Sequence, residues 1–102
     1  MRGLIMKRYM YDFREYTGET YTTGGIEIPL KHLKKVMFAV VEPVFPDTDD
    51  TVYKIETTYE DNKVKVVIKS IDVTGTSPVS WTELSNGADI SGFKFKVFAF
   101  GY

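Results

Sequence analysis

A β-strand pattern runs through the stretch FKFKVFAFGY, residues 93–102. Its side chains alternate between two faces, because successive residues of a strand point to opposite sides of a sheet. One face is apolar from Phe93 to Ala99, and the other carries two lysines followed by Phe98, Phe100 and Tyr102. We therefore expect a strand that is half-exposed at its lysines and is covered on both faces after residue 97.

A second aromatic strand is expected over residues 5–13. Its odd-numbered positions place Tyr9, Tyr11 and Phe13 on one face. A helix is the competing interpretation, because Met6, Met10 and Phe13 also recur at helical spacing. Two sources of cover for the final strand are open: this N-terminal strand, from within the chain, or a neighbouring subunit.

The middle of the chain contains the longest apolar run, VMFAVV at residues 36–41. A run without alternation predicts a central strand that is buried on both faces. Pro43 and Pro46 bracket its end, and residues 45–50 are expected to form a polar, proline-limited loop.

Two further strands, 52–59 and 63–71, predict a β-hairpin. Their shared apolar faces carry Tyr53, Ile55 and Tyr59 on the first strand and Val64, Val66 and Ile68 on the second. The turn is Glu60-Asp61-Asn62, in which Asn62 suits a left-handed conformation.

The remaining segments predict shorter elements. Strands are expected at 19–23 and 26–28, separated by Gly24-Gly25, and one amphipathic helical turn is expected at 30–35 with Leu30 and Leu33 inward. Residues 72–80 are small and polar and indicate an exposed loop, after which Trp81 and Leu84 anchor the chain. Asn86-Gly87 indicates another turn.

This pattern predicts one all-β domain over residues 1–102. Strands do not alternate with long helices, which argues against a doubly wound parallel sheet. An antiparallel β-sandwich fits best, jelly-roll-like, with about six to seven strands and at most one short helical turn.

Composition narrows the function classes. The absence of cysteine excludes disulfides and thiolate chemistry, and no apolar run is long enough to predict a membrane span or a secretory signal. A net charge of −1 argues against a general nucleic-acid binder. The charge is unevenly distributed, since residues 1–35 carry +3, residues 36–62 carry −6 and residues 63–102 carry +2. Solvated loops explain this pattern, and unlike patches that meet on neighbouring copies are the alternative.

Residues with catalytic or metal-binding chemistry are sparse, and we assign no catalytic, cofactor or metal residue. His32 is the only histidine and lies in a lysine-rich turn, and no serine has the context of a nucleophile. One histidine without cysteine supplies too few zinc ligands. The Asp47–Asp50 cluster has oxygen ligands that suit calcium but lacks the EF-hand spacing, so solvated loop charge is the favoured interpretation. Glu42 and Glu56 are a weak candidate for paired carboxylates.

Aromatic residues support two binding hypotheses. Trp81 and the tyrosines would form a sugar-stacking platform if their rings are exposed and coplanar. Lysines and arginines interleaved with aromatic residues, at 7–11 and 93–96, would bind single-stranded nucleic acid on an exposed sheet, but the net charge disfavours this. Gly24-Gly25 lacks the lysine and helix of a phosphate loop and indicates backbone geometry instead.

The order of these features resembles that of small β-rich structural proteins of tailed-phage virions, namely capsid decoration or tail-associated proteins. The resemblance covers residues 20–102: TTGGIEI at 22–28, the turn at 30–35, the strand at 36–41, the hairpin ending in NKVKV, a polar loop, and FKVFAFGY at 95–102. The strand at 5–13 lies outside the match. The resemblance implies a virion component that stabilises or decorates a shell as an oligomer, with no catalytic residues to carry over.

The leading expectation is therefore a non-enzymatic virion structural protein, assembled in the host cytoplasm. It would be a homo-oligomer that contacts a major capsid or tail protein, with no cofactor and no membrane. The subunit-contact residues would be Tyr9, Tyr11, Phe13, Phe98, Phe100 and Tyr102. A carbohydrate-binding module is the alternative, and an enzyme or nucleic-acid binder would require a polar pocket or a basic face.

Overall fold

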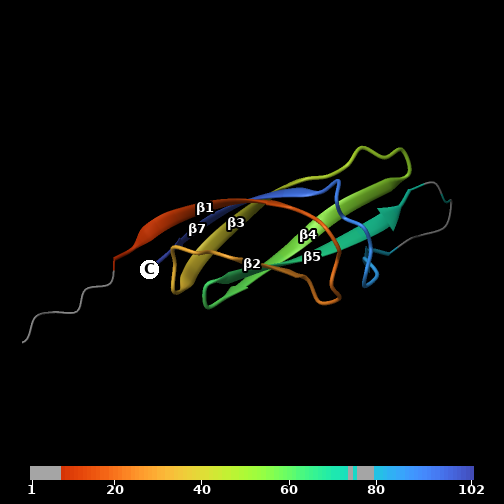
Figure 1. Cartoon of the computed structure of the whole chain (residues 1–102). Helices are drawn as coiled ribbons and strands as arrows, with labels where there is room; N and C mark the ends of the chain where they lie inside the picture. The colour runs from red at the N-terminus through yellow and green to blue at the C-terminus, as the bar shows by residue number, and fades with distance from the viewer. Residues whose placement is uncertain (1–7, 74, 76–79) are drawn as a thin grey trace, which may run out of the picture.

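The computed structural model describes residues 8–73, 75 and 80–102, and within these residues the chain is all-β, with seven strands and no helix. The strands are β1 (Met10–Thr17), β2 (Ile26–Pro29), β3 (Val36–Val44), β4 (Thr51–Glu60), β5 (Lys63–Asp72), β6 (Thr82–Glu83) and β7 (Lys94–Gly101). They form two antiparallel sheets, one ordered β1–β7–β3 and the other β2–β5–β4, with β6 paired to β5 (Figure 1).

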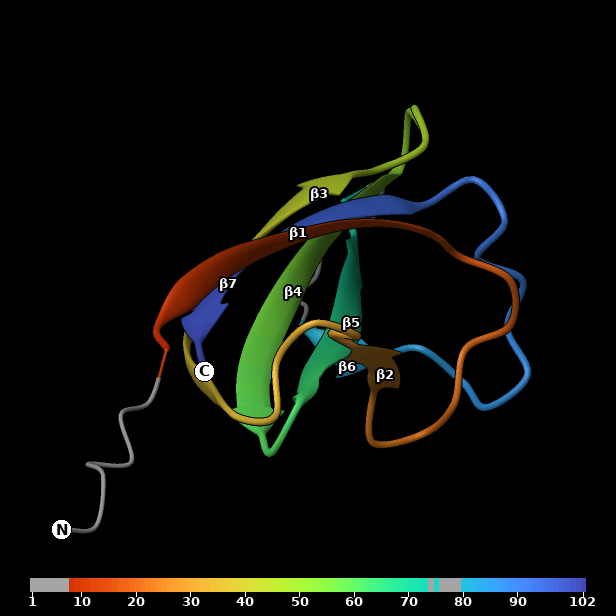
Figure 2. The ribbon, with the colours of Figure 1, turned by 60° about the vertical axis from the view of Figure 1, so that its left-hand side comes forward.

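The two sheets share one hydrophobic core. Figure 2 shows β1, β7 and β3 crossing over β4 and β5. The alternation predicted for residues 93–102 is confirmed on the inner side, where Phe95, Val97 and Ala99 are buried. The β2–β5–β4 sheet contributes Ile26, Ile28, Val64, Val66 and Ile68 to the same core. Because every second residue of each strand faces this layer, the core is built from the period-two pattern.

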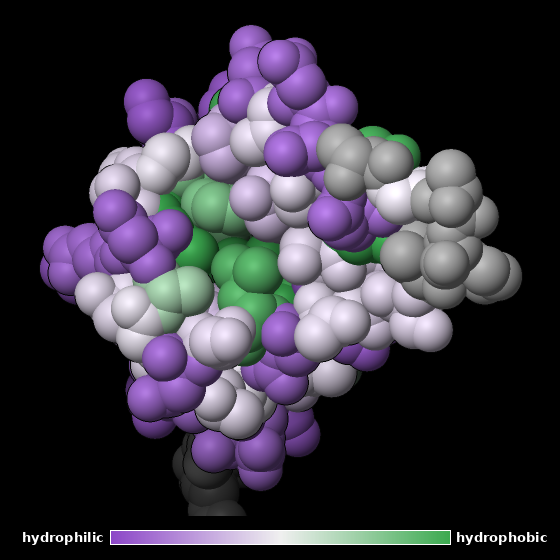
Figure 3. Space-filling model, turned by 90° about the vertical axis from the view of Figure 1, so that its right-hand side faces the viewer, coloured by the Kyte–Doolittle hydropathy of each residue, from purple (hydrophilic) through white to green (hydrophobic). Residues whose placement is uncertain are grey.

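Hydrophobic residues reach the surface at one end of the molecule. Figure 3 views this end, the right-hand side of Figure 1, and shows hydrophobic surface in its centre, surrounded by residues of intermediate and hydrophilic character. Partly buried residues such as Phe45, Tyr53 and Leu84 pack against the core. Trp81 is 38% exposed, so Leu84 alone fulfils the predicted role of an anchor.

The predicted hairpin is confirmed as β4 and β5, which pair from Thr51↔Asp72 to Glu60↔Lys63. The turn residue was assigned incorrectly, because Asp61 adopts the left-handed conformation with φ 54° and Asn62 does not. Both residue types tolerate this region, so composition could not distinguish them.

The run at 36–41 is not a central strand. β3 pairs only with β7 and forms an edge of its sheet. Phe38 and Val40 are exposed rather than buried, because no described element covers the outer face of this sheet. Pro43 lies within β3, which suits an edge because proline has no N–H to donate to a further strand. A run that is apolar on both faces is buried on both faces only where a second layer covers the sheet, and local patterning does not show whether that layer exists.

The N-terminal aromatic strand is confirmed as a strand rather than a helix within the described residues, but it begins at Met10 and continues to Thr17. The predicted positions 5–7 lie outside the described residues. β1 pairs with β7 along its whole length, from Met10↔Gly101 to Thr17↔Lys94. β1 therefore lies beside β7 rather than over it, and the predicted cover on the outer face of β7 is absent in the described chain.

The shorter elements are partly confirmed. β2 is present, but residues 19–23 form no strand. They are joined to residues 87–90 by an isolated bridge, Thr20↔Asp89, and by backbone hydrogen bonds. Gly24 and Gly25 have φ of 93° and 117°, a backbone conformation that glycine adopts more readily than other residues, which confirms the interpretation of this pair as backbone geometry. Residues 30–35 form a turn without a helix, and Leu30 and Leu33 are buried as predicted. The loop prediction for 72–80 lies largely outside the described residues.

Gly101 allows β7 to approach the bulge at the start of β3. A Cβ at Gly101 would overlap the backbone carbonyl of Lys35, and the register of β3 shifts between Val36 and Phe38. Two backbone hydrogen bonds follow, since the Lys35 N–H donates to the Tyr102 carbonyl at 2.9 Å and the Tyr102 N–H donates to the Lys35 carbonyl at 3.1 Å. This pairing places Lys35 beside Tyr102.

We expect Gly101→Ala to lower the free energy of unfolding by about 1–3 kcal/mol, because the backbone must move to admit the methyl group. Gly92→Ala is the matched control, since a Cβ there meets only Pro46 at 3.4 Å, an ordinary contact. It should change stability by less than about 0.5 kcal/mol in urea unfolding. Equal effects of the two substitutions would contradict the close approach at Gly101.

Candidate functional site

The six predicted contact residues lie together on the outer face of the β1–β7–β3 sheet. Cross-strand register pairs Tyr11 with Phe100 and Phe13 with Phe98. Tyr9 and Tyr102 extend the same alternation past the ends of β1 and β7, and their ring centroids are 5.7 Å apart. The structure thus brings two sequence-distant aromatic segments onto one surface.

The rings contact one another across the strands. Tyr9 stacks on Phe100 with centroids 5.7 Å apart and an interplanar angle of 15°. Tyr11 lies 5.0 Å from Phe100, and Phe13 lies 4.9 Å from Phe98. Such pairs stabilise a sheet by a few tenths of a kcal/mol to about 1 kcal/mol each. These contacts hold the rings in place on the surface without burying them.

Sequence reasoning missed the contribution of β3 to this face. Phe38 pairs with Phe100, and Val40 pairs with Phe98. Their own period-two signal was present, but the apolar residues between them hid it. We define the aromatic face as the outer surface formed by Tyr9, Tyr11, Phe13, Phe38, Val40, Phe98, Phe100 and Tyr102.

The aromatic face is largely solvent-exposed. Tyr11 is 83% exposed, and four further rings of the face, those of Tyr9, Phe13, Phe38 and Phe98, are 47–58% exposed. At about 200 Å² per aromatic side chain, these five rings present about 600 Å² to solvent. This area reaches the upper end of the largest apolar patches on ordinary monomers, about 300–600 Å².

Charged residues border the aromatic face along the strands. Lys96 pairs with Glu15 on β1 and with Glu42 on β3, which forms a row of alternating charge at one end. At the other end Lys35 lies beside Tyr102. Val36 is buried, so its neighbour Lys35 falls on the outer side of the sheet. The apolar centre therefore lies between a charged row and a lysine.

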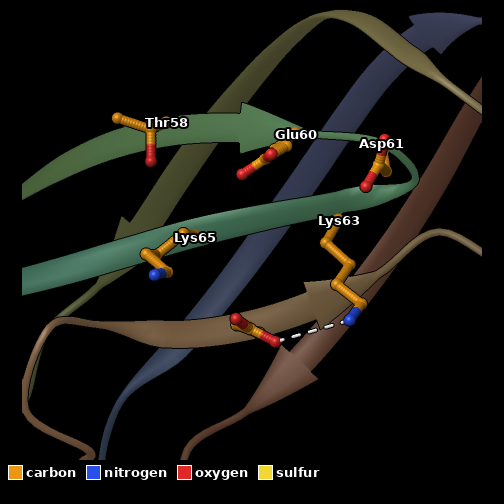
Figure 4. Close-up of a pocket in the computed structure, with 6 residues that line it drawn as sticks. Thr58, Glu60, Asp61, Lys63 and Lys65 are labelled. Carbon is orange, nitrogen blue, oxygen red and sulfur yellow. Dashed lines mark ion pairs between the residues drawn. The ribbon is translucent and has the colours of Figure 1, made fainter.

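The opposite outer face, on β2–β5–β4, is dominated by charge. A shallow cleft of about 240 Å³ is lined by Glu27, Thr58, Glu60, Asp61, Lys63 and Lys65 (Figure 4). Lys63 Nζ lies 3.7 Å from Glu27 Oε2, and further along the sheet Lys69 Nζ lies 3.0 Å from Glu56 Oε1. The lysines and carboxylates of these two ion pairs are at least partly exposed to solvent. This face therefore lacks the desolvated, convergent polar groups that acid–base catalysis requires.

A second cleft of about 210 Å³ lies against β1 and contains the only histidine. Asp12 accepts the backbone N–H of Phe13 at 2.9 Å and that of His32 at 3.3 Å, while Arg14 Nη1 donates to the Pro29 carbonyl at 2.5 Å. His32 is exposed. The polar groups of this cleft therefore connect β1 to the end of β2 and to the turn at 30–35.

The remaining candidate residues do not converge. Asp47, Asp49 and Asp50 are exposed, and within residues 8–73, 75 and 80–102 no group of three or more His, Asp or Glu side chains is placed to hold a metal ion. Glu42 and Glu56 do not face each other, because they lie on the outer sides of different sheets. Their predicted pairing is wrong.

Trp81 is separate from the exposed tyrosines. Lys54 Nζ lies 4.8 Å from the Trp81 ring centroid, which places the ring beside β4 rather than on the aromatic face. Trp81, Tyr9 and Tyr11 therefore do not form one coplanar platform. The exposed ring surface of this molecule is concentrated on the β1–β7–β3 sheet.

The part of the chain that the structure describes contains no helix with the length and apolar character to cross a membrane. No protein-family model matches the sequence, and no curated protein or solved structure matches it either.

Proposed function

We propose that this chain is a non-enzymatic structural protein of a tailed-phage virion that binds neighbouring subunits through its aromatic face. The observation that supports a contact function is the size and continuity of this exposed apolar surface, on a sheet face that residues 8–73, 75 and 80–102 leave uncovered. The virion setting is supported by the resemblance of residues 20–102. The neighbours would be further copies of the chain, or a major capsid or tail protein.

The proposed fold type is a β-sandwich of jelly-roll-like order. Its support is the nested antiparallel pairing of β1 with β7 and of β2 with β5, together with the placement of β3 and β4 in different sheets. Jelly rolls wind two such sheets from Greek keys and are common in viral shells. A rigid framework of this kind holds the aromatic rings in a fixed array.

The test is binding to the products of neighbouring genes. We expect co-expression with adjacent capsid or tail genes to yield a complex visible by size-exclusion chromatography and electron microscopy. Val40→Glu should abolish binding, since it places a charge in the aromatic face. Val52→Glu is the matched control, because Val52 is also an exposed valine on an edge strand, at 47% against 49%, but lies on the other sheet.

Two outcomes would contradict the proposal. One is a complex that tolerates Val40→Glu as well as it tolerates Val52→Glu. The other is a gene neighbourhood of metabolic enzymes with no particle component.

A carbohydrate-binding module is the second candidate, and the exposure of Tyr11 and Tyr9 favours it. Sugar rings stack on such faces. Binding to insoluble polysaccharides that is lost in Tyr11→Ala, with no bound protein partner, would support this candidate over the contact function.

A further inference from the structure

We infer that the aromatic face pairs with a second copy of the chain across a two-fold axis that crosses β7 above Ala99. The inference rests on the proposed contact function and names the partner. The axis lies parallel to the sheet and perpendicular to its strands, so the two sheets pack face to face with β7 antiparallel to the β7 of the second copy.

The residues of this face are arranged symmetrically about Ala99. Rows across the sheet contain Glu15, Lys96 and Glu42, then Phe13, Phe98 and Val40, then Tyr11, Phe100 and Phe38, then Tyr9, Tyr102 and Lys35. A rotation of 180° about this axis places the first row of one copy over the fourth row of the other copy. It places the second row of one copy over the third row of the other. The two inner rows are apolar except for the Tyr11 hydroxyl, so apolar surface meets apolar surface.

The outer rows then become complementary. Glu42 of one copy lies over Lys35 of the other, and Lys96 lies over the ring of Tyr102, where a cation–π contact is favourable. Glu15 lies over Tyr9, whose hydroxyl is a donor. Each contact occurs twice, as an isologous interface requires.

The alternative two-fold axis, parallel to the strands, is disfavoured by charge. It would place Lys96 over the Lys96 of the second copy and Glu15 over Glu42. Like charges opposed across an interface suppress a binding mode. The charge pattern therefore selects one of the two face-to-face arrangements.

The edges of the sheet are less suited to a partner than its face. Pro43 lacks an N–H on β3, and the Asp12 carboxylate accepts the N–H of Phe13 on β1. Edge strands blocked in this way resist pairing with another strand. A second copy that docks on the face avoids both obstacles.

The area agrees with a specific dimer. The five most exposed rings supply about 600 Å² per copy, and the flanking charged rows extend the contact toward the roughly 800 Å² per partner of a standard interface. Two sheets packed face to face keep their strands within about 30° of each other, so the row correspondence persists near the axis.

The test is sedimentation equilibrium of the purified full chain. Wild type should be a dimer, twice 11.7 kDa. Val40→Glu should raise the dissociation constant at least about 100-fold, because it buries an unpaired charge, while Val52→Glu should leave it unchanged.

Charge exchange tests the register itself. Lys35→Glu and Glu42→Lys should each weaken the dimer about tenfold, since two attractive pairs become repulsive. An equimolar mixture of these two variants should restore wild-type affinity, because every Lys–Glu contact is then re-formed between unlike copies. Both side chains are exposed in the single chain, so folding should be preserved in each variant.

The outcomes separate the inference from the proposed function. A dimer that is lost in Val40→Glu but is indifferent to the charge exchanges would overturn the two-fold arrangement and leave the contact function standing. A wild-type chain that remains monomeric at millimolar concentration would overturn the second copy as partner, whereas co-expression with neighbouring gene products tests the contact function independently.

Discussion

Phe95→Ala should lower the free energy of unfolding by about 3–5 kcal/mol, the range for a buried aromatic residue truncated in a core. Phe95 is fully buried on the inner face of β7 and contacts the rings of Phe93 and Tyr16, with centroids 6.4 and 6.3 Å away. The substitution removes the transfer free energy of the ring and leaves a cavity between the two sheets. Urea unfolding followed by far-ultraviolet circular dichroism measures the loss.

Phe98→Ala is the matched control, since the same residue type lies three positions along the same strand but on the aromatic face. Phe98 is 47% exposed and contacts Phe13. Its truncation should cost only about 1–2 kcal/mol of stability.

The two substitutions should rank in the opposite order for association. Phe98→Ala should weaken self-association about tenfold or more, as for an aromatic residue near the centre of an interface. Phe95→Ala, measured where it is fully folded, should not. At a concentration at which wild type and both variants are monomeric, equal losses of stability would contradict the exposed position of Phe98, and would indicate that the outer face of β7 is covered within the chain.

Much of the contact surface followed from alternation alone. Residues 9–13 and 98–102 each place aromatic side chains on one face, and period two is enough to group them. That these two groups would share a sheet required the pairing of β1 with β7, which local patterning does not encode. Their being neighbours in one layer, rather than one covering the other, is what leaves the rings exposed.

The missed residues of the surface have a different cause. Phe38 and Val40 alternate with Ala39 and Val41, so both faces of β3 are apolar and hydrophobicity carries no directional signal. Whether such a strand lies at the centre or at the edge of a sheet depends on how many strands the chain supplies to each layer. Here the first sheet has three strands, and β3 is left at its edge.

Tyr21 has a structural role that no local pattern indicates. It lies in the segment predicted as a strand, yet its side chain, 1% exposed, reaches β5 between the stretches that pair with β2 and β6. The Tyr21 hydroxyl accepts the Ile68 N–H at 3.3 Å and donates to Glu83 Oε2 at 2.6 Å. Glu83 also accepts the Gly24 N–H at 2.7 Å. The Tyr21 hydroxyl thus takes the place of a backbone carbonyl as the acceptor for the Ile68 N–H, in the interval of β5 between the residues that pair with β2 and those that pair with β6.

This network predicts that stability falls at alkaline pH. Burial, reinforced by the hydrogen bond to Glu83, raises the pKa of Tyr21 to about 12 from its usual 10.0. The unfolded chain therefore releases this proton at a lower pH than the folded chain. The stability contributed by Tyr21 is fully present below pH 10 and should decline as pH rises from about 10 to about 12, by about 2–3 kcal/mol.

The pKa shift of Glu83 links stability to pH in the opposite direction, so that stability is lost on acidification. The hydrogen bonds from Tyr21 and Gly24 lower the pKa of its carboxyl group, so the associated stability should be lost as pH falls below the ordinary glutamate range.

Tyr21→Phe should therefore cost about 1–3 kcal/mol near neutral pH, because the Ile68 N–H loses its acceptor, and should remove this residue's share of the alkaline decline. Tyr11→Phe, on the exposed aromatic face, is the matched control and should retain both the neutral stability and the decline. Urea unfolding at a series of pH values from 7 to 12 distinguishes the variants. If Tyr21→Phe declined with pH as steeply as wild type, the alkaline loss would belong to other groups, and the hydroxyl would not be the partner that closes the gap in β5.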